Sequence, residues 1–187
     1  DGFRPNSEFN SSNIFFQLGY DFSNDTSITA EVTYLDYLTQ QAGGLSDRMF
    51  EENPYQSNRS RNWFALSWFL YNLKFEHSFN SNSNISLNLF GLDAQRNAIG
   101  FRSNRVSQID SNQERDLIKG DFNNYGIELR WLKRFQLGNI KSVFLIGSKY
   151  YNSDNTSEQG PGSLYSDADF SFQKDEFPNY NQQSAYN

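Results

Sequence analysis

NIFFQLGYDF, residues 13–22, places a large apolar side chain at every second position. These positions hold Ile14, Phe16, Leu18, Tyr20 and Phe22. The positions between them are polar or glycine, apart from Phe15. An alternation with period two predicts a β-strand whose two faces meet different solvents. An aromatic-rich face opposite a polar face is typical of a transmembrane β-barrel strand, which has lipid on one side and an aqueous or plugged lumen on the other.

Similar alternation recurs along the chain and predicts an all-β fold, an antiparallel up-and-down meander of about six strands. The expected strands are 12–22, 27–38, 62–78, 84–97, 122–133 and 141–151. Short polar turns join the strands within each pair, whereas the long polar stretches 39–61, 98–121 and 152–187 follow the pairs. Outer-membrane barrels sort their connections in this way, with short periplasmic turns and long extracellular loops. The expected strands also reach the roughly 9–11 residues that a tilted membrane strand needs.

The composition supports a barrel and argues against several other classes. Only 36% of the 187 residues are hydrophobic, yet 17% are aromatic, as the aromatic girdles of a barrel require. The mean hydropathy of -0.77 argues against a helical membrane protein. A net charge of -6 makes nucleic acid an unfavourable partner. With no cysteine and a single histidine, His77, the sequence predicts no enzyme, no metal site and no cofactor.

Four segments resemble the barrel of TonB-dependent outer-membrane receptors, and within that family the ferric-citrate (FecA-like) branch. They are GGLSDRMFEENPYQSNRSRNWF (43–64), FGLDAQRNAIGF (90–101), RDLIKGDFNNYGIELR (115–130) and GSKYYNSDNTSEQGPGSLYSDADFSF (147–172). The resemblance implies a segment of a 22-stranded transmembrane β-barrel in the bacterial outer membrane. It also implies import of a ferric chelate, such as a siderophore or ferric citrate, with energy from TonB passed through a plug domain.

Residues 1–187 are therefore expected to be a partial β-barrel domain, an internal fragment without the plug domain and the remaining strands. The expected partners are the ferric chelate, the lipid bilayer of the outer membrane, and TonB acting through the missing plug. No nucleic acid is expected to bind.

Arginines in and beside the long polar stretches are the candidate ligand-binding residues. Guanidinium groups hold carboxylates through paired hydrogen bonds and stay charged at any relevant pH, as recognition of an anionic chelate would need. We select Arg59, Arg61, Arg102 and Arg115, because the resemblance is strongest around them. The alternative is that these arginines pair with neighbouring acidic side chains or with lipopolysaccharide phosphates.

Two other classes of protein remain open from the sequence. A passive porin-type barrel would share every local feature but would lack a plug and energy coupling. A soluble, secreted β-sandwich that binds carbohydrate would explain the aromatic and acidic content, although its strands should be shorter and its loops less strictly sorted.

Overall fold

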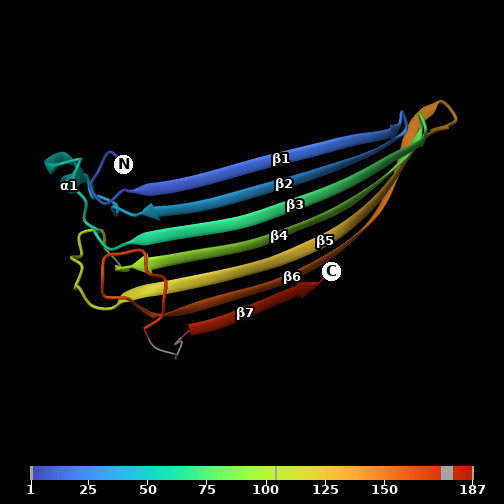
Figure 1. The fold of residues 1–187 in the computed structure, drawn as a ribbon. Coiled ribbons are helices and arrows are strands. Elements are labelled where there is room, and N and C mark those ends of the chain that lie inside the picture. Colours follow the sequence, from blue (N-terminus) through green and yellow to red (C-terminus); the bar gives the residue numbers. More distant parts are fainter. Residues whose placement is uncertain (1, 104, 174–178, 187) are drawn as a thin grey trace.

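The structure is a computed structural model that describes residues 2–103, 105–173 and 179–186. Its strands are β1 (Phe9–Ser23), β2 (Thr26–Gln40), β3 (Trp63–Asn80), β4 (Ser83–Gly100), β5 (Arg115–Leu137), β6 (Ile140–Gly162) and β7 (Asn179–Tyr186). They form one antiparallel sheet in the order of the sequence, β1 to β7. Figure 1 shows this sheet as a single curved layer, with tight turns at one end and long loops at the other.

The expected meander is confirmed, but its second half differs from the expectation in two strand boundaries and one additional strand. β5 begins at Arg115 rather than at 122, β6 continues to Gly162 rather than ending at 151, and β7 adds a seventh strand to the expected six. The segments 115–121 and 152–162 are mostly polar, so they carry no alternation that would reveal a strand. Their backbones pair with each other along the whole ladder from Arg115 and Gly162.

The one described helix is α1 (Asp47–Glu52), in the first long loop. Ser46 caps its N-terminus by accepting a hydrogen bond from the Met49 backbone N–H. No helix in the described parts of the chain has the length and hydropathy needed to cross a membrane.

The strand register sorts the side chains into an apolar face and a polar face. Cross-strand partners share a face, and the apolar face contains one continuous row across six strands. This row is Leu18, Ala30, Leu73, Leu89, Ile127 and Tyr150. A row on the polar face is Gly19, Thr29, Lys74, Asn88, Glu128 and Lys149. Ile127 and Leu129 therefore lie on the face opposite to Glu128 and Arg130.

The sheet encloses almost no hydrophobic core. Among the described residues, the buried apolar side chains are Ala94, Ile99 and Leu117, and all three lie toward the loop end. Large apolar side chains on the apolar face are instead exposed, for example Ile14 at 61% and Leu18 at 60%. Phe16, Tyr71, Leu73 and Leu89 on this face are also exposed, whereas Phe75 and Leu87 are half-buried. A single sheet with such a face is not a sandwich of two packed sheets.

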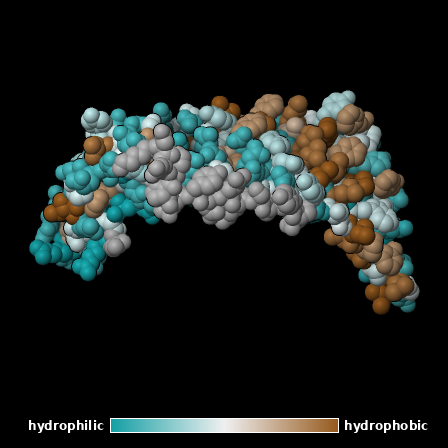
Figure 2. All heavy atoms as spheres, turned by 90° about the horizontal axis from the view of Figure 1, so that it is seen from below, coloured by the Kyte–Doolittle hydropathy of each residue, from teal (hydrophilic) through white to brown (hydrophobic). Residues whose placement is uncertain are grey.

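The apolar band on this face runs diagonally across the strands. On this face of β1, the large apolar side chain nearest the loops is Ile14. The row of cross-strand partners that starts at Ile14 ends on β6 at Asp154. On β6, however, the large apolar side chains of this face begin only at Tyr150, four residues closer to the turn. With about 3.3 Å per residue and about 4.8 Å between strands, this displacement over five strand steps corresponds to a slant of roughly 30°. Figure 2 shows apolar residues gathered over the half of the sheet that carries the tight turns, whereas the loop end is mostly hydrophilic.

Candidate ligand-binding rim

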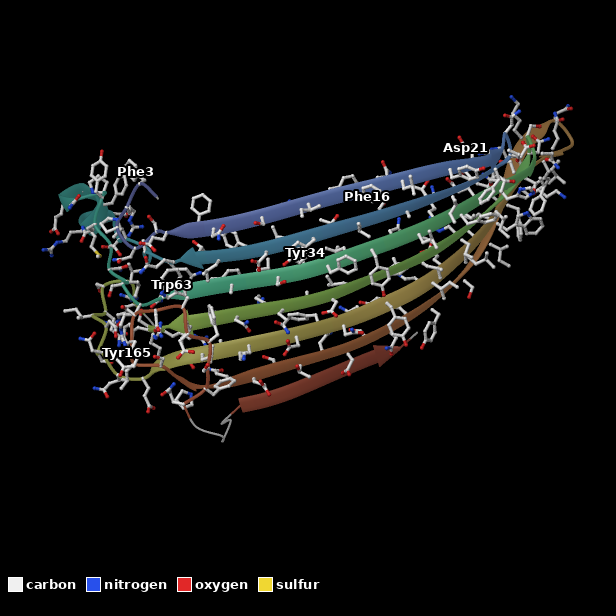
Figure 3. All side chains as sticks on the ribbon, viewed as in Figure 1. Phe3, Phe16, Asp21, Tyr34, Trp63 and Tyr165 are labelled. Atoms are coloured by element: carbon white, nitrogen blue, oxygen red, sulfur yellow. The ribbon has the colours of Figure 1, made fainter. Side chains whose placement is uncertain are left out.

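The loop end of the sheet carries three long connections that lie against one another. In the described residues they are 41–62, 101–103 with 105–114, and 163–173. Figure 3 labels Trp63 and Tyr165 at this end, far from Asp21 at the turn end. The indole Nε1–H of Trp63 donates to the backbone carbonyl of Ser166 at 2.7 Å, so β3 is fastened to the third connection. We call this loop end the rim.

Arg61 joins all three connections through one buried guanidinium. Its Nε and Nη2 donate to the two carboxylate oxygens of Asp110 at 2.9 and 2.5 Å. The same group donates to the carbonyl of Gln113 at 3.2 Å and to that of Leu164 at 2.7 Å. Only 7% of the residue is exposed. The N–H groups of this guanidinium therefore bind the loops themselves.

Arg115, the first residue of β5, makes a second set of hydrogen bonds between the connections, next to those of Arg61. Its Nε donates to the Ser163 carbonyl at 2.8 Å, and its Nη1 donates to the carbonyls of Arg61 at 3.0 Å and Asp167 at 2.7 Å. An ion pair to the Asp167 carboxylate completes the set at 3.4 Å. The arginine is 1% exposed. Arg115 thus ties the third connection to the first and shares a direct hydrogen bond with Arg61.

Arg59 links the first connection to the second and is 6% exposed. Its Nη1 donates to the Gln108 carbonyl at 3.1 Å, and its Nη2 donates to the Ser103 hydroxyl at 2.6 Å. The guanidinium also lies 5.1 Å from the centre of the Phe101 ring, within the range of a cation–π contact. Unlike Arg61 and Arg115, Arg59 has no carboxylate hydrogen-bonded to it in the described residues. Arg59, Arg61 and Arg115 together are named the arginine cluster below.

Arg102, the fourth predicted residue, is outside this cluster and mostly in solvent. Its Nη1 donates to an Asp116 oxygen at 3.0 Å, with 57% of its side chain exposed. Asp116 also accepts two 3.0 Å hydrogen bonds from the Gln159 amide. The structure therefore brings three of the predicted arginines together in buried contacts and leaves one accessible at the rim. Whether any of the four contacts a ligand stays a prediction.

Asp110 lies between two arginines of the cluster. Burial raises the pKa of this carboxyl, but other contacts outweigh that effect and hold the pKa below its ordinary value. These are the hydrogen bonds from Arg61 and from the Asn112 backbone N–H, and the charges of Arg61 and Arg59. Asp110 is consequently an ionised partner for the cluster at neutral pH.

Two open hollows flank Arg59. One, of about 510 Å³, is lined by Gln41, Gly43, Asn58, Arg59, Phe101 and Ser103, among others. The other, of about 380 Å³, lies between the first two connections and includes Met49, Arg59, Gln108 and Asp110 in its wall. Their walls combine amide, hydroxyl and guanidinium groups, so both could accept a polar or anionic guest. No group of three or more potential metal-ligating side chains occurs in the described residues.

Sequence reasoning missed Arg4, which fastens the start of the chain to the same rim. Its guanidinium donates to the carbonyls of Gln56 at 2.7 Å, Gly43 at 2.8 Å and Ala42 at 3.3 Å. The signal available was an arginine between two residues that favour order, Phe3 and Pro5, within an otherwise polar start. That signal is weak, because it does not indicate which residues would accept hydrogen bonds from the arginine.

No protein-family model and no curated protein matches the sequence. Among solved structures, the chain resembles the ferric citrate transporter FecA in its unliganded form, with a TM-score of 0.83 and 16% sequence identity. The match covers 98% of this chain, whereas the chain spans 26% of the length of that solved chain. At this identity the likeness shows the fold alone. The seven-stranded meander has the arrangement of a segment of a β-barrel wall.

Proposed function

We propose that this chain forms part of the wall of a bacterial outer-membrane receptor that imports an anionic ferric chelate such as ferric citrate. Energy for import would come from TonB through a plug domain, as the sequence resemblance implies. The protein would act by binding and transport, not as an enzyme. The similarity in fold to a ferric citrate transporter supports this assignment.

The slanted apolar band is the observation that carries the proposal. A membrane is flat, so strands that cross it at an angle must shift their lipid-facing residues progressively from one strand to the next. The observed slant of roughly 30° lies close to the tilt of about 35–45° that strands adopt in outer-membrane barrels. A face of exposed Phe, Leu and Tyr arranged in this way has lipid as its natural solvent.

The proposal divides the four predicted arginines into two roles at the rim. Arg102 is exposed and retains N–H groups beyond its bond to Asp116, so it can contact an anion directly. Arg59 lines both hollows, so a guest in either one would meet its side chain. Arg61 and Arg115 donate to loop carbonyls and carboxylates, and they would act by positioning the loops.

The test is equilibrium binding of ferric citrate to the receptor that contains this chain, with each arginine replaced in turn. Arg102→Ala should weaken binding by about 1.5–3 kcal/mol, the scale of a hydrogen bond to a charged group. Arg102→Lys should recover part of the loss, because the charge returns without the planar fork. Arg48→Ala is the matched control, since Arg48 is also exposed and paired with a carboxylate, that of Glu52.

Unchanged binding in the Arg59, Arg61, Arg102 and Arg115 variants would overturn the anion-binding assignment. Measuring uptake of the chelate, rather than its binding, distinguishes a TonB-dependent receptor from a passive porin. Import that continues at the same rate in cells without TonB would contradict the energy-coupled receptor and favour the porin.

A further inference from the structure

The hairpin of β5 and β6 reaches beyond its neighbours at the turn end. Ser83, the first residue of β4, pairs with Lys133, but β5 continues to Leu137 before the chain turns at Gly138 and Asn139. Figure 1 shows this hairpin extending past the other turns. Its tip, residues 132–145, is named the long hairpin tip below.

Positive charge accumulates on the long hairpin tip without acidic neighbours along the chain. No Asp or Glu occurs between residues 129 and 153. Lys133, Arg134 and Lys141 are exposed, and none of them forms an ion pair in the described residues. Glu128, the nearest carboxylate preceding them on β5, is paired with Arg130.

The tip is also apolar on both faces, in contrast to the rest of the sheet. Leu137 and Ile140 face each other at the turn, and each is 67% exposed. On the side that is polar elsewhere, Val143 is 62% exposed and Leu145 is 59% exposed. Apolar side chains among unpaired cations suit the boundary between acyl chains and headgroups.

The other two turns differ in charge. The turn between β1 and β2 carries Asp21 and Asp25 with no cation nearby in the sequence. The turn between β3 and β4, Ser81–Asn82, has no charged residue. Any attraction to an anionic surface is therefore confined to one of the three hairpins.

We propose that the long hairpin tip binds the headgroups of anionic phospholipids through Lys133, Arg134 and Lys141. This inference rests on the proposed function, which places the apolar face in a bilayer. Lys133 lies on the apolar face of the tip, whereas Arg134 and Lys141 lie on its other face. All three lie at or beyond the end of β4, at the turn-side margin of the apolar band, where lipid headgroups would meet the projecting tip from either side. Cations near a membrane surface attract anionic lipids, and the three here form no ion pair in the described part of the chain that would compete.

Trp131 reports on this site directly. Its indole Nε1–H donates to the Ser83 hydroxyl at 2.9 Å, and its ring packs edge-on against Phe144 at 6.0 Å between centroids. The receptor that contains this chain would be reconstituted with every other tryptophan replaced by Phe, including Trp63 and Trp68, so that Trp131 is the sole tryptophan. Fluorescence quenching is then compared in phosphatidylcholine–phosphatidylglycerol vesicles in which either one lipid or the other is brominated.

We expect phosphatidylglycerol to be enriched about three- to tenfold around Trp131 at low salt, given the attraction of each cation for an anionic surface. The enrichment should fall as salt screens the charges. Replacing Lys133, Arg134 and Lys141 together by Gln should abolish it, whereas Lys133→Arg with Lys141→Arg should keep it. A matched reporter is Phe22→Trp with all native tryptophans replaced by Phe, since this site lies beside Asp21 and should show no enrichment.

Equal quenching of Trp131 by the two brominated lipids would overturn the proposal. An acidic protein would then be the better candidate partner for the three cations. Enrichment that survives the triple Gln variant would overturn it as well, because the cations would not be its cause. If neither brominated lipid quenches Trp131 at all, the apolar face does not meet lipid, and the proposed function fails together with this inference.

Discussion

The two ends of the sheet are stabilised by different interactions. Over the turn half, large apolar side chains project outward, and the backbone ladder is the main contact between strands. At the loop end, three arginines are buried and their guanidinium groups bind backbone carbonyls of distant segments. The few buried apolar side chains, such as Ile99 and Leu117, also lie there.

This difference shows which part of the molecule depends on its surroundings. The turn half exposes an apolar surface that water does not favour, so its stability depends on what covers that surface. At the loop end, by contrast, arginines donate to the backbone carbonyls of Gln113, Ser163, Leu164 and Asp167, so the loops are held by contacts within the protein. A change that acts on one end should therefore leave the other largely intact.

The largest expected effect is from Arg115→Ala. The substitution leaves the Ser163, Arg61 and Asp167 carbonyls without their donor, and we expect a loss of about 3–5 kcal/mol of stability at the rim. The measurement is denaturant unfolding in detergent, followed together with protease cleavage in residues 163–173. If the Arg115→Ala variant is cleaved at the same rate and unfolds at the same denaturant concentration as the parent, the arginine cluster does not stabilise the rim.

A charge placed in the apolar band should cost slightly less. Leu73 lies in the central row of the apolar face, so Leu73→Arg should destabilise the protein in lipid by about 2–4 kcal/mol. Lys74→Arg is the control on the adjacent position, which faces the other side of the sheet. Reversible denaturant unfolding in vesicles measures both. Equal stabilities for the two variants would mean that the apolar face does not meet lipid.

Acid should loosen the rim through Asp110. Because the pKa of Asp110 is lower in the folded loop than in the unfolded chain, its ion pair with Arg61 contributes fully above the ordinary value of 3.8. The contribution is lost as the pH falls below that value. Trp63, bonded to Ser166, should report the loosening by fluorescence between pH 7 and pH 2. Asp110→Asn should already be loosened at pH 7, and an unchanged titration in that variant would exclude Asp110 as the cause.

The smallest expected effect is from Arg48→Ala. Arg48 pairs with Glu52 within α1, but 87% of its side chain is exposed. Such pairs contribute about 0.5 kcal/mol or less. Comparing the free energies of unfolding of Arg48→Ala and Arg115→Ala would show whether the burial of an arginine, rather than the number of arginines, decides the stability of the rim. A loss comparable to that of Arg115→Ala would contradict this.

Alternation predicted the strands wherever the two faces meet different solvents. It identified β1 to β4 closely, because residues such as those at 13–22 alternate cleanly. It failed at 152–162, where both faces are polar. It also failed at 115–121, where Leu117 and Ile118 are adjacent and lie on opposite faces, so the apolar residues do not alternate with polar ones. The sequence selected Arg59, Arg61, Arg102 and Arg115 together, but it could not separate buried from exposed members. Their partners lie far along the chain, as Leu164 does from Arg61.

The order of the strands has a consequence for how the chain folds. Each strand pairs with its neighbour in sequence, so the ladders between β1 and β6 close only short stretches of chain: two residues at each tight turn, and at most residues 41–62. Because the entropy of closing a loop grows with the logarithm of its length, the longest of these closures costs only about 2 kcal/mol more than the shortest. Hairpins should therefore form first and join side by side, and the arginine contacts between distant loops should follow.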